Sequence, residues 1–302
     1  MASRGFKNEA TARELRLVLG FSPGSFSDRI ARLISGPLAD ALGRPVAIEL
    51  RPGYSGVPAA CEVAAAAPDG NVLFMATLGT HALAPNRAGK PPYDPLRDFS
   101  CVSLVAKSPL LLACNSNLAI GSVAELIERA RVKDNPLTYA TSAVGGAPHL
   151  AAELFQEMTG TTLQHVRYGE TERLYRDLEA GAVALSFNNL ISMLPRCRRG
   201  TLRALAVSSA GRIEAAPDQP TLAEAGVPGY EVTNWVGIVG PPALDPALRV
   251  ELSAAVTSAV ASAEVTSALR AGGIMPCGGA PEVFASFMAS ELKRWRGIAA
   301  RL

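Results

Sequence analysis

The sequence has few of the residues from which catalytic and metal sites are usually built. Its 302 residues include three histidines, His81, His149 and His165, and their spacing matches no metal site. There is no G-x-S-x-G nucleophile motif, no Walker A lysine and no G-x-G-x-x-G loop, and the run GYSG at 53–56 has the wrong spacing. Because no nucleophile, base and orienting group can be assembled, we expect no enzyme, no cofactor and no metal.

Cysteine usage and charge exclude further classes of protein. The five cysteines are scattered, odd in number and without any C-x-x-C, which excludes a zinc or redox motif of the usual spacing. We interpret them as small buried residues. The formal charge is +2, and the densest basic run, at 196–203, is short and has no interleaved aromatic residues. We therefore expect no nucleic-acid partner.

The sequence leaves the location of the protein in the cell open. No apolar run approaches the length needed to span a membrane. Residues 1–14 are polar and do not resemble a signal peptide, so either the protein is cytosolic or a leader has been trimmed from it. At this length the chain has room for two domains and a large core.

The most informative stretch lies at 15–32. An apolar run at 15–19, stopped by Gly20, predicts a buried strand, and Pro23 and Gly24 indicate the loop that follows it. The candidate N-caps of the next helix are Ser25, Ser27 and Asp28. A helix that begins here directs its unpaired backbone N–H groups and its positive dipole end at one point. The pattern predicts an anion site that needs no lysine or arginine.

A second stretch, at 137–154, repeats this arrangement. It contains a short strand, Ser142, a loop with Gly145 and Gly146, and a helix that starts near Pro148. In both copies the helix runs into a glycine, which a second strand follows. Two similar βαβ units predict two similar domains with a cleft between their helix N-termini. Two opposed anion sites suit a molecule with a carboxylate at each end.

The rest of the chain predicts how the two domains are joined. The segment at 101–115 predicts two strands broken at Ser108-Pro109, the first passage between domains, and the segment at 220–242 returns the chain. The runs at 245–262 and 281–302 predict amphipathic closing helices. The predicted fold is α/β, with domain 1 formed by residues 1–105 and 235–302 and domain 2 by residues 106–234.

With these residues in place, the chain resembles the solute-binding proteins of tripartite tricarboxylate transporters, the Bug or TctC-like receptors. The resemblance covers almost the whole chain. It is carried by the motifs PGSFSDRIAR, RPGYSG, APDGNVL, YDPLRDF, AVGGAPHLAAELF, HVRYGETERLYRDLEAGAV, LRALAVSSAGR, PTLAEAGVPGYEVTNW and ELKRW, in family order.

The resemblance implies a two-domain periplasmic-binding-protein fold of type II that closes over a small carboxylate. Main-chain amides and hydroxyls of the two strand–loop–helix motifs, with ordered water, would hold the ligand. The resemblance also implies a periplasmic monomer that delivers its ligand to membrane subunits of the transporter, or senses it. This chain departs from the family pattern at five places. It has Ser25 where the family has a glycine, Tyr54-Ser55 where the family has alanine-glycine, and Arg167 where the family has a proline. Residues 169–173 replace a run of lysine and glycine, and Asn188 replaces an aspartate.

Sixteen residues are candidates for ligand binding. They are Phe21, Pro23, Gly24, Ser25, Phe26, Ser27, Asp28, Thr77, Thr80, Ser142, Gly145, Gly146, Ala147, His149, Tyr168 and Asn188. For five of them a structural role is an open alternative. Thr80 would cap the next segment, Asp28 would shape its loop and His149 would pack or cap. Phe21 and Tyr168 would pack in the core.

The candidate residues also predict the type of ligand. An amine on the ligand would need an acceptor, and Asn188 offers only a neutral carbonyl where the family has an acid. Phe26 offers a flat apolar surface within the polar loop. We therefore expect a mono- or dicarboxylate without an amine, aromatic acids included. The alternative function is a cytosolic or orphan carboxylate sensor of the same fold.

Overall fold

A computed structural model describes residues 14–87, 89, 91–132 and 134–301. The polar stretch at 1–13, on which the expectation about a leader rests, lies outside the described residues. The strands are β1 (Leu15–Leu19), β2 (Val46–Leu50), β3 (Val72–Thr77), β4 (Ser100–Asn115), β5 (Thr138–Thr141), β6 (Gln164–Arg167), β7 (Leu185–Asn189), β8 (Leu202–Val207), β9 (Thr233–Gly240) and β10 (Met275–Pro276).

The helices lie between and after these strands. They are α1 (Phe26–Leu42), α2 (Val57–Ala64), α3 (Val123–Ala130), α4 (Ala147–Thr159), α5 (Thr171–Ala180), α6 (Leu190–Arg198), α7 (Pro246–Ala261), α8 (Ala263–Ala271), α9 (Pro281–Arg294) and α10 (Arg296–Ala299). Three short helical turns, η1 (Tyr54–Gly56), η2 (Gly79–Leu83) and η3 (Ala84–Asn86), complete the described elements. The predicted strand at 15–19 is confirmed. The predicted glycine stops of the two repeated helices are confirmed at Gly43 and Gly160, both in the left-handed conformation that glycine tolerates, and Gly181 ends α5 in the same way.

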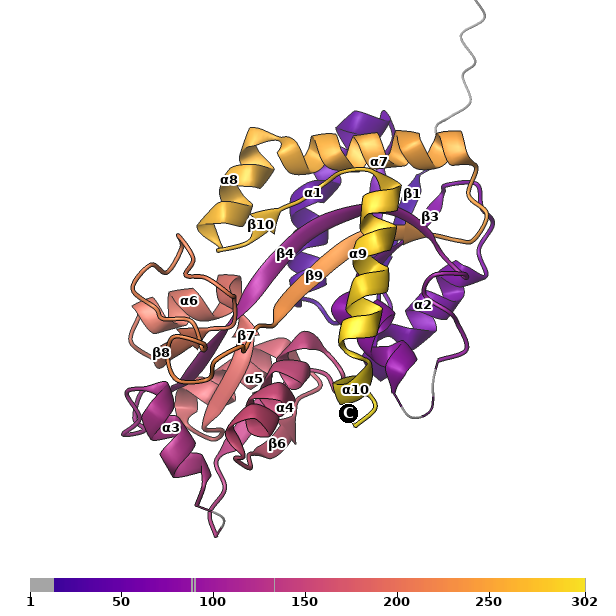
Figure 1. Cartoon of the computed structure of the whole chain (residues 1–302). Helices are drawn as coiled ribbons and strands as arrows, with labels where there is room; N and C mark the ends of the chain where they lie inside the picture. The colour runs from indigo at the N-terminus through magenta and orange to yellow at the C-terminus, as the bar shows by residue number, and fades with distance from the viewer. Residues whose placement is uncertain (1–13, 88, 90, 133, 302) are drawn as a thin grey trace, which may run out of the picture.

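The described strands form one sheet in the order β2-β1-β3-β9-β4-β7-β5-β6, and β10 and β8 pair with β4 outside this path. Strand β4 runs the length of the molecule beside β9 (Figure 1). Its pairing with β9 ends at Pro109, and its pairing with β7 begins at Leu110. This switch divides the molecule into two lobes. Lobe 1 holds β1–β3, β9, β10 and the start of β4, and lobe 2 holds β5–β8 and the end of β4.

The predicted break at Ser108-Pro109 is wrong, because β4 is continuous there. Proline lacks an N–H group and normally interrupts a ladder of strand hydrogen bonds. Here Pro109 stands at the point where β4 changes partner, and the next residue, Leu110, donates its N–H to the hydroxyl of Ser208 at 2.7 Å. The chain therefore passes between the lobes within one strand. The boundaries 1–105 with 235–302 and 106–234 stay a prediction.

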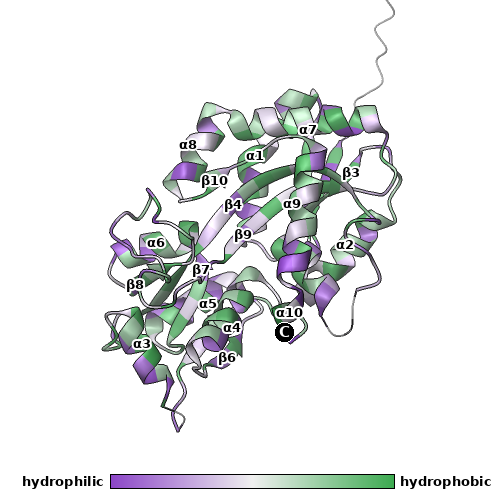
Figure 2. Ribbon diagram, viewed as in Figure 1, coloured by the Kyte–Doolittle hydropathy of each residue, from purple (hydrophilic) through white to green (hydrophobic). Residues whose placement is uncertain are grey.

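The core follows the strands and the helix faces packed on them. In lobe 1 the side chains of β1 are buried against α1, where Ile30, Ile34 and Leu38 recur at helical spacing, and against α7. Figure 2 shows hydrophobic residues concentrated on the end of β4 in lobe 2. In the described part of the chain no single helix is long and apolar enough to cross a membrane; α7 and α8 pass that test only as a pair, bent by 63°.

The closing helix predicted at 245–262 is confirmed as α7, capped by Asp245 and Ser262, and α8 follows it after a bend. The run predicted at 281–302 is divided at Trp295 into α9 and α10. The indoles of Trp235, on β9, and Trp295 both donate to one carboxylate oxygen of buried Glu291, at 3.1 and 2.9 Å. Trp295 is thus buried, and not the surface anchor that an amphipathic helix would present. All five cysteines are free; Cys101 and Cys114 are buried, and the others are half-buried.

Candidate ligand-binding site

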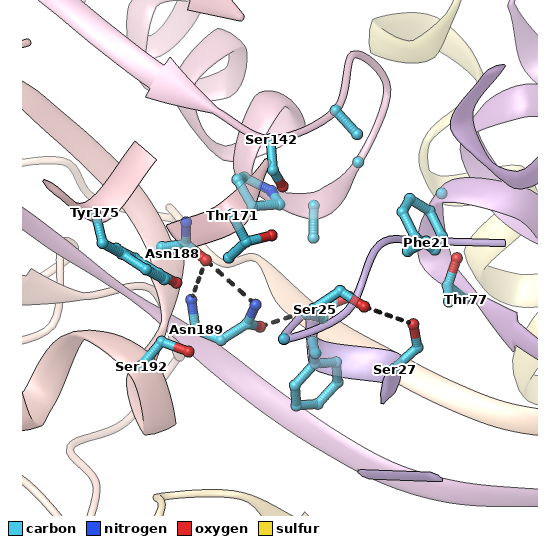
Figure 3. Close-up of a pocket in the computed structure, with 18 residues that line it drawn as sticks. Phe21, Ser25, Ser27, Thr77, Ser142, Thr171, Tyr175, Asn188, Asn189 and Ser192 are labelled. Atoms are coloured by element: carbon cyan, nitrogen blue, oxygen red, sulfur yellow. Dashed lines mark hydrogen bonds between the residues drawn. The ribbon is translucent and has the colours of Figure 1, made fainter. Parts of the chain in front are cut away.

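A cavity between the lobes holds about 600 Å³ of empty space, part of it open to solvent (Figure 3). No charged side chain stands among the described residues that line it. The lining residues are Phe21, Gly24, Ser25, Phe26, Ser27, Thr77, Gly79, Ser142, Ala143, Gly146, Ala147, Pro148, Thr171, Tyr175, Asn188, Asn189, Ser192 and Asn234.

The first wall is the loop between β1 and α1. Gly24 adopts a left-handed φ of 76°, and its N–H donates to Oδ2 of Asp28 at 2.8 Å. Ser25 is the N-cap of α1, and its hydroxyl accepts from the N–H of Asp28 at 3.4 Å. Phe26 and Ser27, the first two residues of α1, line the cavity next to this loop. Their backbone N–H groups have no partner within the helix, as at any helix N-terminus.

The second wall is the loop between β5 and α4. Gly145 has a φ of 72°, and its N–H donates to Nδ1 of His149 at 3.0 Å. Gly146 is the N-cap of α4 with an extended backbone, φ −98° and ψ 173°. In this loop the conformation that requires glycine therefore occurs at Gly145 and not at Gly146. The N-terminus of α4 and the hydroxyl of Ser142 border the cavity opposite the first loop.

Ten of the sixteen predicted residues line the cavity: Phe21, Gly24, Ser25, Phe26, Ser27, Thr77, Ser142, Gly146, Ala147 and Asn188. Six do not, namely Pro23, Asp28, Thr80, Gly145, His149 and Tyr168. Pro23 is exposed on the outer side of its loop. Asp28 is buried, and its carboxylate is used by the N–H of Gly24 and by Arg32 at 2.9 Å. Asp28 therefore shapes the loop.

The other four of these residues also make contacts within the protein. The hydroxyl of Thr80 bonds to Thr77 and to Nδ1 of His81 at 2.9 Å. Gly145 is turned toward Arg87, whose guanidinium lies 2.8 Å from the position of a Cβ atom there. Tyr168 is buried among apolar side chains of lobe 2.

His149 belongs to a stack of three rings behind the second loop. Its ring lies 4.5 Å from that of His165, which lies 4.7 Å from that of Tyr139. Burial, and to a smaller extent the neighbouring His165, lower the pKa of His149 to about 4. A neutral ring is required for Nδ1 to accept from Gly145, so His149 supports the loop and takes the packing role.

We expect stability to fall as His149 is protonated. Its folded pKa of about 4 lies below its ordinary value of 6.5, so the unfolded chain binds the proton first. The stabilisation is therefore complete above pH 6.5 and is lost as the pH falls toward 4. The free energy of unfolding is measured in urea at pH 7 and at pH 5. In the His149→Asn variant the amide oxygen can still accept from Gly145 and cannot be protonated in this range. The variant should therefore lose less of this free energy between the two pH values than the native chain does. Equal losses would contradict this assignment.

The structure brings eight further residues to the cavity that the sequence did not single out as ligand-binding. Gly79 follows β3, Ala143 and Pro148 extend the second loop, and Thr171, Tyr175, Asn189, Ser192 and Asn234 come from lobe 2 and β9. The sequence carried a signal for three of them: Gly79 ends the apolar strand pattern at 71–79, Asn189 lies near the end of the strand pattern at 183–190, and Thr171 lies in the first turn of the helix pattern at 170–181. Nothing local distinguishes Tyr175 or Ser192 from core and surface residues of a helix.

The lobes also touch each other around the cavity. The hydroxyl of Ser55 in lobe 1 donates to the carbonyl of Val144 in lobe 2. Arg29 of α1 lies 3.7 Å from Glu172 of α5. These contacts join the rims of the two lobes in this structure.

Comparisons with known proteins agree with this geometry. The family model described as tripartite tricarboxylate transporter family receptor matches residues 30–302. The protein BugT of Bordetella pertussis is 33% identical over 289 residues, which are 95% of this chain and 88% of BugT.

Two solved structures from Rhodopseudomonas palustris are similar over nearly the whole fold. Rpa4515 with adipate is 36% identical with a TM-score of 0.91, and the match covers 96% of this chain and 97% of Rpa4515. MatC with bound malate is 29% identical with a TM-score of 0.90, and the match covers 95% of this chain and 99% of MatC. The predicted α/β fold with two domains around a ligand cleft is thereby confirmed.

Proposed function

This chain belongs to the tripartite tricarboxylate transporter receptor family, a family of solute-binding receptors and not of enzymes, and from that premise we propose that it captures a small carboxylate between its lobes. The observation that carries this proposal is the pairing of two helix N-termini, of α1 and α4, across a cavity with no charged side chain among its described lining residues.

Elementary electrostatics favours an anion in such a cavity. Each helix N-terminus presents backbone N–H groups and a positive dipole end, worth about 0.3–1 kcal/mol toward a negative group and more when partly buried. A desolvated carboxylate needs several donors, and the hydroxyls of Ser25, Ser27 and Ser142 add to the backbone groups. The adipate of Rpa4515 and the malate of MatC are ligands of this chemical class.

We propose a mono- or dicarboxylate without an amine, aromatic acids included. An ammonium group needs an acceptor, and the cavity offers no carboxylate among its described lining residues. Glu172, beside Thr171, faces Arg29 at 3.7 Å and Arg196 at 3.5 Å. Phe26 adds an apolar ring to the wall. These features support an amine-free ligand.

The biological setting follows from the family and is part of the proposal. The receptor would act as a monomer in the periplasm and deliver its ligand to membrane subunits of a tripartite transporter. The same fold used as a cytosolic or orphan carboxylate sensor is the second candidate. The pocket chemistry is the same in both cases, so gene neighbours and cell fractionation distinguish them.

Calorimetry with matched pairs tests the ligand class. Succinate is compared with aspartate, and benzoate with its amino derivatives, under the same buffer and salt. We expect the amine-free member of each pair to bind more tightly, because the ammonium group would be buried without an acceptor. Consistently tighter binding of the amine-bearing members would contradict the proposal.

A further inference from the structure

One end of the cavity is built from a second set of hydrogen-bond donors. Figure 3 shows Tyr175, Asn188, Asn189 and Ser192 at one end and Phe21, Thr77 and Ser27 at the other. The first group surrounds the N-termini of α5 and α6, whose first residues are Thr171 and Leu190. The starts of α1, α4, α5 and α6 therefore all contribute residues to the lining of this cavity.

Thr171 is the observation that points to a ligand at this second set. It is 6% exposed, and its hydroxyl has no hydrogen-bond partner among the described residues, although it borders the cavity. A buried hydroxyl without a partner costs free energy in an otherwise well-paired interior. A ligand atom in the cavity would supply the missing partner.

The asparagine amides at this end have orientations set by backbone donors. The N–H of Trp235 donates to Oδ1 of Asn234 at 3.0 Å, which directs the Asn234 amide nitrogen to Oδ1 of Asn189 at 2.9 Å. The N–H of Asn189 donates to Oδ1 of Asn188 at 2.9 Å. A backbone N–H can only donate, so each amide oxygen it contacts is fixed in place.

These orientations leave the Asn188 amide with only donors for a ligand. The amide nitrogen of Asn189 also approaches Oδ1 of Asn188, at 3.4 Å, so that oxygen already has two donors. The amide nitrogen of Asn188 makes no hydrogen bond within the described chain, and it belongs to a residue that lines the cavity. Its two N–H groups are therefore available to a ligand acceptor.

We infer that Thr171, Asn188 and Asn189 form a second anion subsite that holds the distal carboxylate of a dicarboxylate. This inference rests on the proposed function, in which the loops before α1 and α4 hold the first carboxylate. The distal group accepts hydrogen bonds from the Asn188 amide, the Thr171 hydroxyl and the N-termini of α5 and α6. Asn188 is then a specificity-determining residue, because its oxygen is used internally and cannot accept from an amine.

The test compares ligands that differ only at the distal end. Hexanoate, adipate and 6-aminohexanoate are titrated by calorimetry, together with the other unbranched dicarboxylates from succinate to suberate. We expect the best dicarboxylate to bind the native chain at least about tenfold more tightly than the monocarboxylate of equal length, the gain from charge-assisted hydrogen bonds. Equal affinities would overturn the inference while leaving the proposed function intact.

Two nearly isosteric variants locate the effect. Thr171→Val removes the hydroxyl, and Asn188→Asp keeps the oxygen that accepts from Asn189 but replaces the amide nitrogen with an anionic oxygen. Both should lose about tenfold or more of dicarboxylate affinity, and this loss should exceed the loss of hexanoate affinity measured with the same variant. Asn188→Asp should also bind 6-aminohexanoate more tightly than the native chain does.

The controls separate this inference from the proposed function. Thr162→Val, at an exposed position of lobe 2, should leave the affinities for hexanoate and for the dicarboxylates unchanged. Thermal melts check that each variant is folded. If the two pocket variants weaken hexanoate and dicarboxylates equally, the distal subsite is refuted. If the native chain binds no carboxylate of either series, the proposed function fails and this inference fails with it.

Discussion

A chain with valine in place of Gly146 is expected to lose carboxylate binding by about 100-fold while remaining folded. Gly146 is the N-cap of α4 and lines the cavity, so a branched side chain there would cover the N–H groups that the helix offers. Losing a charge-assisted hydrogen bond and part of the dipole interaction costs about 3 kcal/mol, which corresponds to about 100-fold in affinity.

The fold should tolerate this substitution. The backbone of Gly146 is extended, and a Cβ atom there would lie 3.7 Å from Cδ of Pro148, an ordinary contact. Gly169→Val, on the exposed surface of the same lobe with open space around it, serves as the matched control and should keep full affinity. If Gly146→Val binds within a few-fold of the native chain in calorimetry, α4 does not hold the ligand.

Gly79→Val is expected to prevent the cleft from closing. A Cβ atom at Gly79, in lobe 1, would lie 3.1 Å from the carbonyl oxygen of Gly145 and 3.6 Å from Cα of Gly146, both in lobe 2. The two methyl groups of valine would extend further into this contact. Because both loops reach a ligand only when the lobes are closed, affinity should fall at least about tenfold.

Small-angle scattering measures this closure directly. The native chain should show a smaller radius of gyration with saturating ligand than without it, since β4 and β9 join the lobes as a hinge. Gly79→Val should keep the larger radius, and Gly36→Val, at an exposed position of α1, should close like the native chain. A native radius that does not change at saturation would rule out hinge closure for this protein.

Local chemistry made much of the site predictable. Ser25 caps α1 through a hydrogen bond that spans three residues, and Gly43 ends the same helix in the left-handed conformation. The loop before α4 could be predicted for the same reason. Such signals act within a few residues, so they can be read directly from the chain, and they placed both helix N-termini of the proposed first carboxylate site.

The roles of two candidate side chains stayed open in the sequence, although their partners lie only four residues away. Asp28 and His149 have side chains of types that commonly bind ligands. Their polar atoms bond instead to Gly24, Arg32 and Gly145, and these bonds fix the orientation of both side chains. The sequence alone left both roles open for them. A hydrogen bond to a neighbour and one to a ligand require the same side-chain type, so only the packed structure distinguishes them.

By itself, the sequence determined the α/β class and the two βαβ units, and it predicted a cleft that binds anions, because strand periodicity, capping residues and glycine stops are local properties of the chain. The tertiary structure alone decided that β4 runs unbroken through Pro109 and that Thr171, Asn189 and Asn234 meet at one cavity. Those residues lie on three different elements. The exchange of strand partners that brings them together depends on long-range pairing, in which Pro109 pairs with Thr233 and Leu110 with Asn189.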